Sequence, residues 1–250
     1  MMRRYIVLAG VAAIAAAAPA AAVTMVFNGQ DDGAPVTGPF TNSVAAQAQF
    51  LAAAAAYGPV VTEGFETAAQ GFYSPLELGA LTVTYATGNS GPGLSGVTTY
   101  NGYGNFYGFN TTPGGSQWLG FPDYLQSLAT FELDAPTHAF GFFTTGVQSV
   151  FTTSLTVQLV DGSMMTFTLP INIDGGVSYF GLVDTVGFTK VVVSQANLPG
   201  YADAWGVDDV SYTIPDGSVV PEPATWAMLV SGFGAIGLAA RRRRTQRSAS

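Results

Sequence analysis

The sequence contains no cysteine and only one histidine, His138, in 250 residues. Disulfides, thiol catalysis and zinc sites, which need several cysteine or histidine ligands, are therefore excluded. The nucleophile-elbow pattern is also missing, because Gly93-Leu94-Ser95-Gly96 lacks its second glycine in register. A structural role for His138 fits better than a catalytic one, and we expect a protein that is not an enzyme.

Positive charge is scarce between the two ends of the chain. Lys190 is the one basic side chain between residues 23 and 220, whereas fifteen of the sixteen acidic residues lie there, so this segment carries about −14. A surface of this sign repels nucleic acid and favours divalent cations. Nucleic-acid binding is accordingly not expected.

The N-terminus has the pattern of a secretory signal peptide over residues 1–22. Two arginines precede an apolar run from Ile6 to Ala18, and Pro19 ends it. Small residues follow, with Ala20 and Ala22 as the expected cleavage positions. The secretion machinery is the implied partner.

The C-terminus combines a Pro-Glu-Pro motif, an apolar segment and a cluster of arginines. Residues 224–240 are uncharged, and a helix of this length spans roughly 25 Å, the short edge of a membrane crossing. The arginines would hold the end of the chain on the cytoplasmic side as a stop-transfer signal. They are Arg241, Arg242, Arg243 and Arg244.

This tail resembles the PEP-CTERM protein-sorting signal in its PEPxxWA variant. The residues that carry the resemblance are Pro221, Glu222, Pro223, Trp226 and Ala227. The resemblance implies processing by an exosortase, transient anchoring in the inner membrane with the C-terminus in the cytoplasm, and a final place at the cell surface or outside the cell. A plain C-terminal membrane anchor is the alternative.

Between these ends, period-two alternation predicts an all-β domain. Leu81 to Tyr85 and Leu155 to Leu159 alternate apolar with polar residues, and Asp161-Gly162 is a strong hairpin signal. About nine short strands separated by turns indicate a single β-sandwich or jelly roll. One helix is expected before it, in the Ala-rich stretch from Ser43 to Tyr57.

The predicted organisation follows from these patterns. It comprises a signal peptide (1–22), a linker and Ala-rich helix (23–59), a β-sandwich domain (60–216), a linker with the Pro-Glu-Pro motif (217–223), a transmembrane helix (224–240) and a basic cytoplasmic tail (241–250).

The segment from Thr87 to Tyr124 is unusually rich in glycine and aromatic residues. Its rings could fill the core, form an exposed platform for sugar rings, or mediate self-association. The candidates for glycan binding are Tyr100, Tyr103, Tyr107 and Trp118.

Two motifs near the ends of the β region resemble those of carbohydrate-binding jelly rolls. They are Gly64-Phe65-Glu66 and the strand that contains Asp208 and Asp209. The resemblance implies a structural calcium ion held by Glu66 and one of the two aspartates, since alternation along a strand would point these two to opposite faces.

Together with the sequence patterns, these resemblances imply an exported, exosortase-processed protein of the surface or extracellular matrix, which binds glycans or serves as a structural part of an exopolysaccharide layer. The alternative is a secreted polysaccharide hydrolase that uses a pair of carboxylates, with Glu63, Glu66, Glu77 and Glu132 as candidates.

Overall fold

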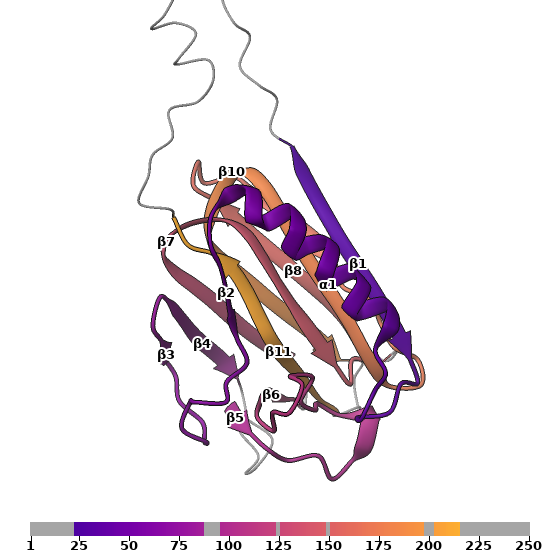
Figure 1. Cartoon of the computed structure of the whole chain (residues 1–250). Coiled ribbons are helices and arrows are strands. Elements are labelled where there is room, and N and C mark those ends of the chain that lie inside the picture. The colour runs from indigo at the N-terminus through magenta and orange to yellow at the C-terminus, as the bar shows by residue number, and fades with distance from the viewer. Residues whose placement is uncertain (1–22, 88–95, 124–125, 149–150, 198–202, 216–250) are drawn as a thin grey trace, which may run out of the picture. The chain divides into compact units, whose positions relative to one another are not determined.

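The computed structural model describes residues 23–87, 96–123, 126–148, 151–197 and 203–215 (Figure 1). They belong to one compact unit that extends from Ala22 to Asp216. The predicted signal peptide, Pro-Glu-Pro linker, transmembrane helix and basic tail lie outside the described residues. Among the residues that are described, no helix has the length and apolar character needed to cross a membrane.

The described part of the chain is built mainly from antiparallel strands, with one α-helix. The elements are β1 (Thr24–Asp32), α1 (Thr41–Ala54), β2 (Val60–Glu63), β3 (Leu76–Leu78), β4 (Leu81–Thr87), β5 (Gly96–Thr98), β6 (Trp118–Asp123), β7 (Gln126–Thr145), β8 (Phe151–Leu159), β9 (Met164–Thr168), β10 (Gly176–Asn197) and β11 (Asp203–Thr213). Two 3-10 turns, η1 (Ala55–Tyr57) and η2 (Gly104–Phe106), complete it.

All strands belong to one open antiparallel sheet. Its main path runs β5-β6-β11-β7-β10-β8-β9; β1 pairs with β10, β2 with β11, and β4 with both β3 and β7. The all-β prediction is therefore confirmed at this level.

The two longest strands, β7 and β10, pair with each other, and each changes its other neighbour about halfway along its length. The first half of β7 pairs with β4, and its second half pairs with β11. Likewise, β10 pairs first with β1 and then with β8. Their mutual register shifts between Val183 and Lys190, next to Pro136 and Gly187. Proline cannot donate to a ladder and Gly187 has a positive φ of 78°, so the chain bends most easily here.

The two halves share one core. Buried residues from β4 and β8 (Leu81, Leu155) pack in the same cluster as those from β6 and β11 (Phe121, Trp205). Phe121 and Trp205 stack with ring centroids 4.5 Å apart. Burial of the apolar side chains of this cluster is a main driving force for folding.

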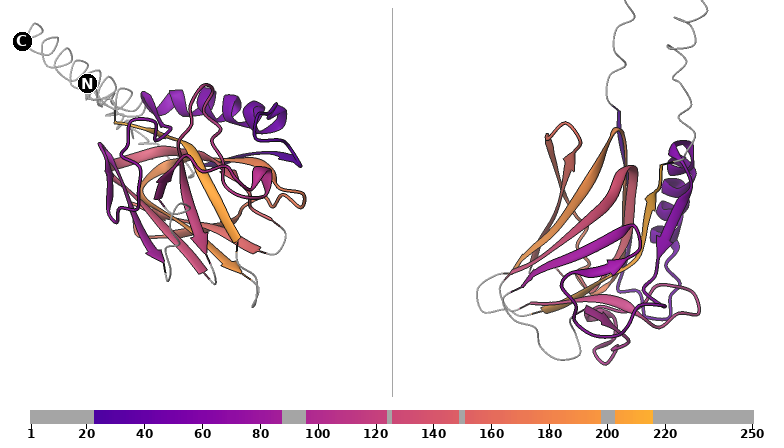
Figure 2. Two further views of the ribbon diagram at one scale, coloured as in Figure 1. Left: turned by 90° about the horizontal axis from the view of Figure 1, so that it is seen from below. Right: turned by 90° about the vertical axis from the view of Figure 1, so that its left-hand side faces the viewer.

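The helix α1 covers the outer face of one half of the sheet (Figures 1 and 2). Its buried residues, including Phe50, pack against Phe143 and Tyr179 of β7 and β10 in a second cluster. Gly181 provides the space, because a Cβ there would lie 2.6 Å from the Phe50 ring.

The structure corrects one boundary. The sequence predicts a linker between Val23 and Phe40, but Thr24–Asp32 form the strand β1, which pairs along its length with β10. Exposed residues alternate with partly buried ones along it, as in an edge strand with one covered face. The hairpin predicted at Asp161-Gly162 is confirmed between β8 and β9.

Candidate functional site: an aromatic loop and an acidic corner

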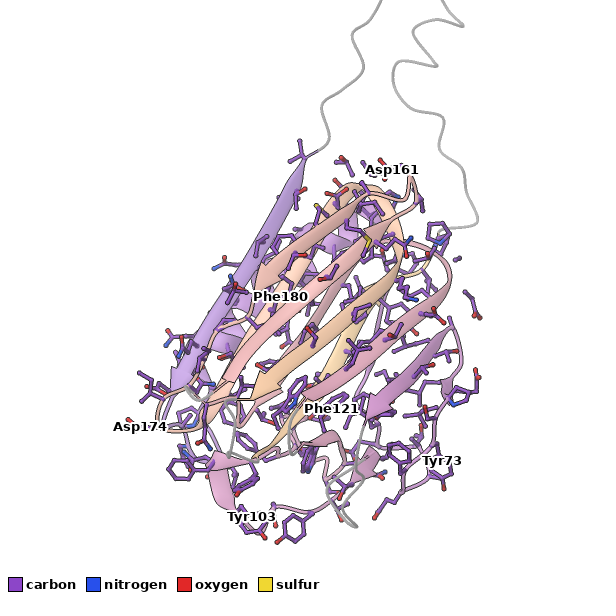
Figure 3. All side chains as sticks on the ribbon, turned by 180° about the vertical axis from the view of Figure 1, so that it is seen from behind. Tyr73, Tyr103, Phe121, Asp161, Asp174 and Phe180 are labelled. Atoms are coloured by element: carbon purple, nitrogen blue, oxygen red, sulfur yellow. The ribbon has the colours of Figure 1, made fainter. Side chains whose placement is uncertain are left out.

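The loop between β5 and β6 presents several aromatic rings to solvent at one end of the described domain (Figure 3). Tyr100 is 40% exposed, Tyr103 50% and Phe106 47%. The Tyr103 ring lies 5.5 Å from Tyr100 and 4.3 Å from Tyr107, measured between ring centroids. We call Tyr100, Tyr103 and Tyr107 the tyrosine cluster. A side-chain hydrogen bond to Tyr103 raises the pKa of Tyr100.

Neighbouring turns hold this loop in place. The side chain of Asn105 donates to the carbonyl oxygen of Asp174 at 3.1 Å, and that of Gln148 donates to the carbonyl oxygen of Phe106 at 2.6 Å. Gly175 allows close approach, because a Cβ there would lie 2.4 Å from the Asn105 carbonyl oxygen. The exposed rings are thus presented by an anchored backbone.

Trp118 requires a correction, because it does not belong to the exposed surface. Its side chain is only 1% exposed, so it offers no face to a sugar. The ring lies against Gly108 and Gly206, where added Cβ atoms would come within 2.0 Å and 2.6 Å of it. Its Nε1 donates to the carbonyl oxygen of Tyr100 at 3.2 Å, so Trp118 supports the tyrosine cluster from beneath.

A second feature brings together Glu66, which follows β2, and Asp208 and Asp209 of β11. We call these three residues the acidic corner. The loop of residues 110–117 contacts all of them: Asn110 donates to Glu66, and the Thr112 hydroxyl donates to Asp209 at 2.7 Å.

Asp208 is fully buried in this corner. Its Oδ2 accepts the backbone N–H of Thr111 at 2.6 Å and that of Thr112 at 3.1 Å, and its Oδ1 accepts the backbone N–H of Asp209 at 2.8 Å. Burial raises the pKa of Asp208 to about 7, and the Asp209 carboxylate adds to the rise, while the Thr111 donors oppose it. Burial also raises the pKa of Asp209.

Glu66 is oriented by the other end of the same loop. Its Oε1 accepts the backbone N–H groups of Ser116 at 2.7 Å and Gln117 at 2.8 Å. Gly115 leaves room for the carboxylate, since a Cβ there would lie 2.2 Å from Oε1. The buried Oε1 of Gln117 has no hydrogen-bond partner in the described part of the chain.

The expected separation of Asp208 and Asp209 onto opposite faces is wrong. The register of β11 against β7 shifts between Asp208 and Ser211, and Asp209 has a positive φ of 48°. This bulge turns both carboxylates toward Thr112. Such a conformation is costly for a residue other than glycine and is often found at functional sites.

The oxygen ligands of the acidic corner suit Ca²⁺ chemically. However, Oε1 of Glu66 and Oδ2 of Asp208 point to different N–H groups of the loop, and no three His, Cys, Asp or Glu side chains among the described residues form a group that could hold a metal ion. In this arrangement the carboxylates of Glu66 and Asp208 accept N–H groups of the loop, and calcium binding stays a prediction.

His138 has structural surroundings. Its Nδ1 lies 2.9 Å from the carbonyl oxygen of Asp184, and its ring stacks on Tyr57 with centroids 5.1 Å apart. Of the candidate carboxylates of a hydrolase, Glu63 and Glu77 line one groove, whereas Glu132 forms an ion pair with Lys190 at 3.1 Å.

Comparison with known proteins adds two kinds of finding. No curated protein matches the sequence. Among solved structures, the enzymatically active domain of tailspike protein 4 of bacteriophage CBA120 is similar at 17% identity and a TM-score of 0.33, over 54% of this chain and 19% of that one. A structure from the carbohydrate-binding modules of the β-sandwich superfamily is similar at 11% identity and a TM-score of 0.32, over 55% and 58% of the two chains. Similarity at this level carries no information on function.

The family model of the PEP-CTERM protein-sorting motif matches residues 219–244. The matched segment includes the Pro-Glu-Pro motif, the apolar stretch and the four arginines on which the resemblance depends. This motif is a sorting signal for exosortase processing. The chain is therefore an exported protein that ends in a PEP-CTERM protein-sorting motif.

Proposed function

We propose that the exported domain is a β-sandwich module of an extracellular polysaccharide layer and that it binds glycan chains through the tyrosine cluster. After export, exosortase processing near Pro221 would separate the domain from its membrane tail. The PEP-CTERM motif supports export and processing, and the exposed aromatic loop supports glycan binding.

The observation that carries this proposal is the anchored tyrosine cluster, in which Tyr100 and Tyr103 are exposed and Tyr107 is half-buried. Sugar rings present apolar C–H faces, which pack well on flat aromatic rings, while hydroxyl groups at the ring edge supply hydrogen bonds. Because Asn105 and Gln148 fix the loop backbone, little conformational entropy is lost when a glycan binds.

The test is retention of the full-length chain, solubilised in detergent, on the exopolysaccharide of its own host. Replacement of Tyr103 by Ala should weaken retention roughly fivefold to tenfold, which corresponds to the loss of one aromatic contact of about 1 kcal/mol. The control is Met164→Ala, which removes an exposed apolar side chain on β9. Equal retention of the wild type and both variants would contradict the proposal.

A hydrolase is the second candidate, and it is favoured by one observation. Glu63 and Glu77 line the same groove, as the two carboxylates of a glycosidase must. New reducing ends released from the polysaccharide by the wild type, and lost in both Glu63→Gln and Glu77→Gln, would favour this candidate over binding alone.

We also propose that the acidic corner binds a structural calcium ion. Glu66 and the two aspartates would supply its oxygen ligands once the N–H groups of the 110–117 loop move away from them. An ion there would link β11 to the segment that follows β2.

A further inference from the structure

A groove of about 610 Å³ lies beside the short strand β3, and no residue of the tyrosine cluster or the acidic corner is among the described residues that line it. Its size falls within the usual range of small-molecule sites. Its lining residues are mostly apolar or small, with carboxylates at two positions. They include Glu63, Tyr73, Leu76 and Glu77.

Each of the two carboxylates of the groove is oriented by a hydrogen bond to one of its oxygens, and among the described residues no hydrogen bond is made to the other oxygen. Oε1 of Glu63 accepts the backbone N–H of Phe65 at 2.6 Å. Oε2 of Glu77 accepts the hydroxyl of Thr82, its neighbour across the β3–β4 ladder, at 2.9 Å. Glu77 is exposed, whereas Leu76 beside it is buried in the core.

The groove also has an aromatic wall. Tyr73 is 44% exposed, and its hydroxyl donates to the carbonyl oxygen of Gln70 at 3.3 Å, which limits its movement. Gly71 lies under the ring, because a Cβ there would be 3.4 Å from it. A flat face next to two acceptors suits a ring that carries donors.

The charge of the groove indicates that the hydrogen-bond donor of its ligand is a cation. No basic residue is among the described residues that line the groove. The single lysine of the described chain, Lys190, forms its ion pair with Glu132 instead. Since the segment between residues 23 and 220 carries about −14, uronic acids and other anionic sugars would be repelled.

We propose that this groove binds a protonated amino sugar of the polysaccharide, with the sugar ring on Tyr73 and its ammonium group between Glu63 and Glu77. The inference rests on the proposed glycan-binding function and names its ligand class. Hydrogen bonds between an ammonium group and carboxylates are charge-assisted and so stronger than neutral ones.

The experiment is calorimetric titration of the full-length chain in detergent with a glucosamine hexamer at pH 6, and with the N-acetylated hexamer as a neutral probe. Glu63→Gln and Glu77→Gln keep the side-chain volume but remove the charge. The matched control is Asp161→Asn, which removes one exposed carboxylate that does not line the groove. Tyr103→Ala reports separately on the tyrosine cluster.

The expected result is binding of the glucosamine hexamer in preference to its N-acetylated form, weakened about tenfold by either glutamate substitution and not by Asp161→Asn. Equal binding of both hexamers, or no effect of the glutamate substitutions, would overturn the inference. If Tyr103→Ala alone weakens binding, the glycan-binding function stands and the amino-sugar site falls. If neither hexamer nor the host polysaccharide binds, both fall.

Discussion

Asp208 and Thr111 are 97 residues apart in the sequence, yet Oδ2 of Asp208 accepts both the backbone N–H and the hydroxyl of Thr111, at 2.6 Å and 3.0 Å. This contact fastens the 110–117 loop to the last strand of the sheet. Because the same loop orients Glu66, a change at Asp208 should affect the whole acidic corner.

The raised pKa of Asp208 predicts how stability depends on pH. A carboxyl group whose pKa rises from 3.8 to about 7 on folding favours the folded state while protonated, and this contribution is lost as the pH rises toward 7. The free energy of unfolding of the full-length chain should therefore fall between about pH 4 and pH 7. Urea unfolding at several pH values measures this decrease.

The Asp208→Asn variant identifies the source of the pH dependence, because it keeps one acceptor and removes the charge. It should flatten the profile in this pH range. In the Asp161→Asn control the decrease should persist, since hydrogen bonds from Ser163 lower the pKa of Asp161 and act in the opposite sense. A profile unchanged by Asp208→Asn would show that another group titrates.

Calcium binding at the acidic corner makes a separate prediction. At a calcium concentration a hundredfold above Kd, the ion would stabilise the domain by about 2.7 kcal/mol, so a chelator should lower Tm by roughly 5–10 °C. The Glu66→Ala variant should no longer respond to chelator, whereas Glu132→Ala should respond like the wild type. A wild-type melt that chelator does not change would refute calcium binding.

The strand and helix patterns were sufficient to predict the main elements. Alternation identifies β4 and β8 because one face of each strand is buried. Asp161-Gly162 marks the turn between β8 and β9, where Gly162 takes a positive φ of 85°. Similarly, the Ala-rich stretch predicts α1, and the C-terminal motif is read directly from its letters.

Long-range contacts explain what the sequence could not predict. β1 contains Asn28, Gly29 and two aspartates, which are poor strand formers, and it is a strand because β10 pairs with it. Trp118 is buried because Gly108 and Gly206 leave space for its ring. The bulge at Asp209 has no local signal, so only tertiary structure brings both aspartates to one loop.

Helix α1 depends on a residue outside it. No side chain at its N-terminus caps it, but the carboxylate of Asp31 accepts the backbone N–H groups of Asn42 at 2.9 Å and Ser43 at 2.8 Å. Asp31→Ala should reduce the free energy of unfolding by about 1 kcal/mol, as measured by urea unfolding. Phe50→Ala should cost about 3–5 kcal/mol, because it leaves a cavity above Gly181. If both substitutions lower the free energy of unfolding equally, the hydrogen bonds of Asp31 to the helix N-terminus contribute more to stability than expected.

Gly108 links the core to the tyrosine cluster. A Cβ at this position would lie 2.0 Å from the Trp118 ring, so Gly108→Ala must displace the indole whose Nε1 holds the carbonyl oxygen of Tyr100. Overpacking of this kind costs about 1–3 kcal/mol, and the displacement should also weaken retention on the polysaccharide.

Gly162→Ala is the control that distinguishes displacement of the Trp118 ring from a general loss of stability. Gly162 has a positive φ and nothing within 4 Å of an added Cβ, so alanine there should cost about 1 kcal/mol in stability without affecting retention. If Gly108→Ala lowers stability but leaves retention unchanged, the Trp118–Tyr100 contact serves the fold alone. If retention falls under conditions where the variant remains folded, burial of Trp118 is what places the exposed tyrosines for binding.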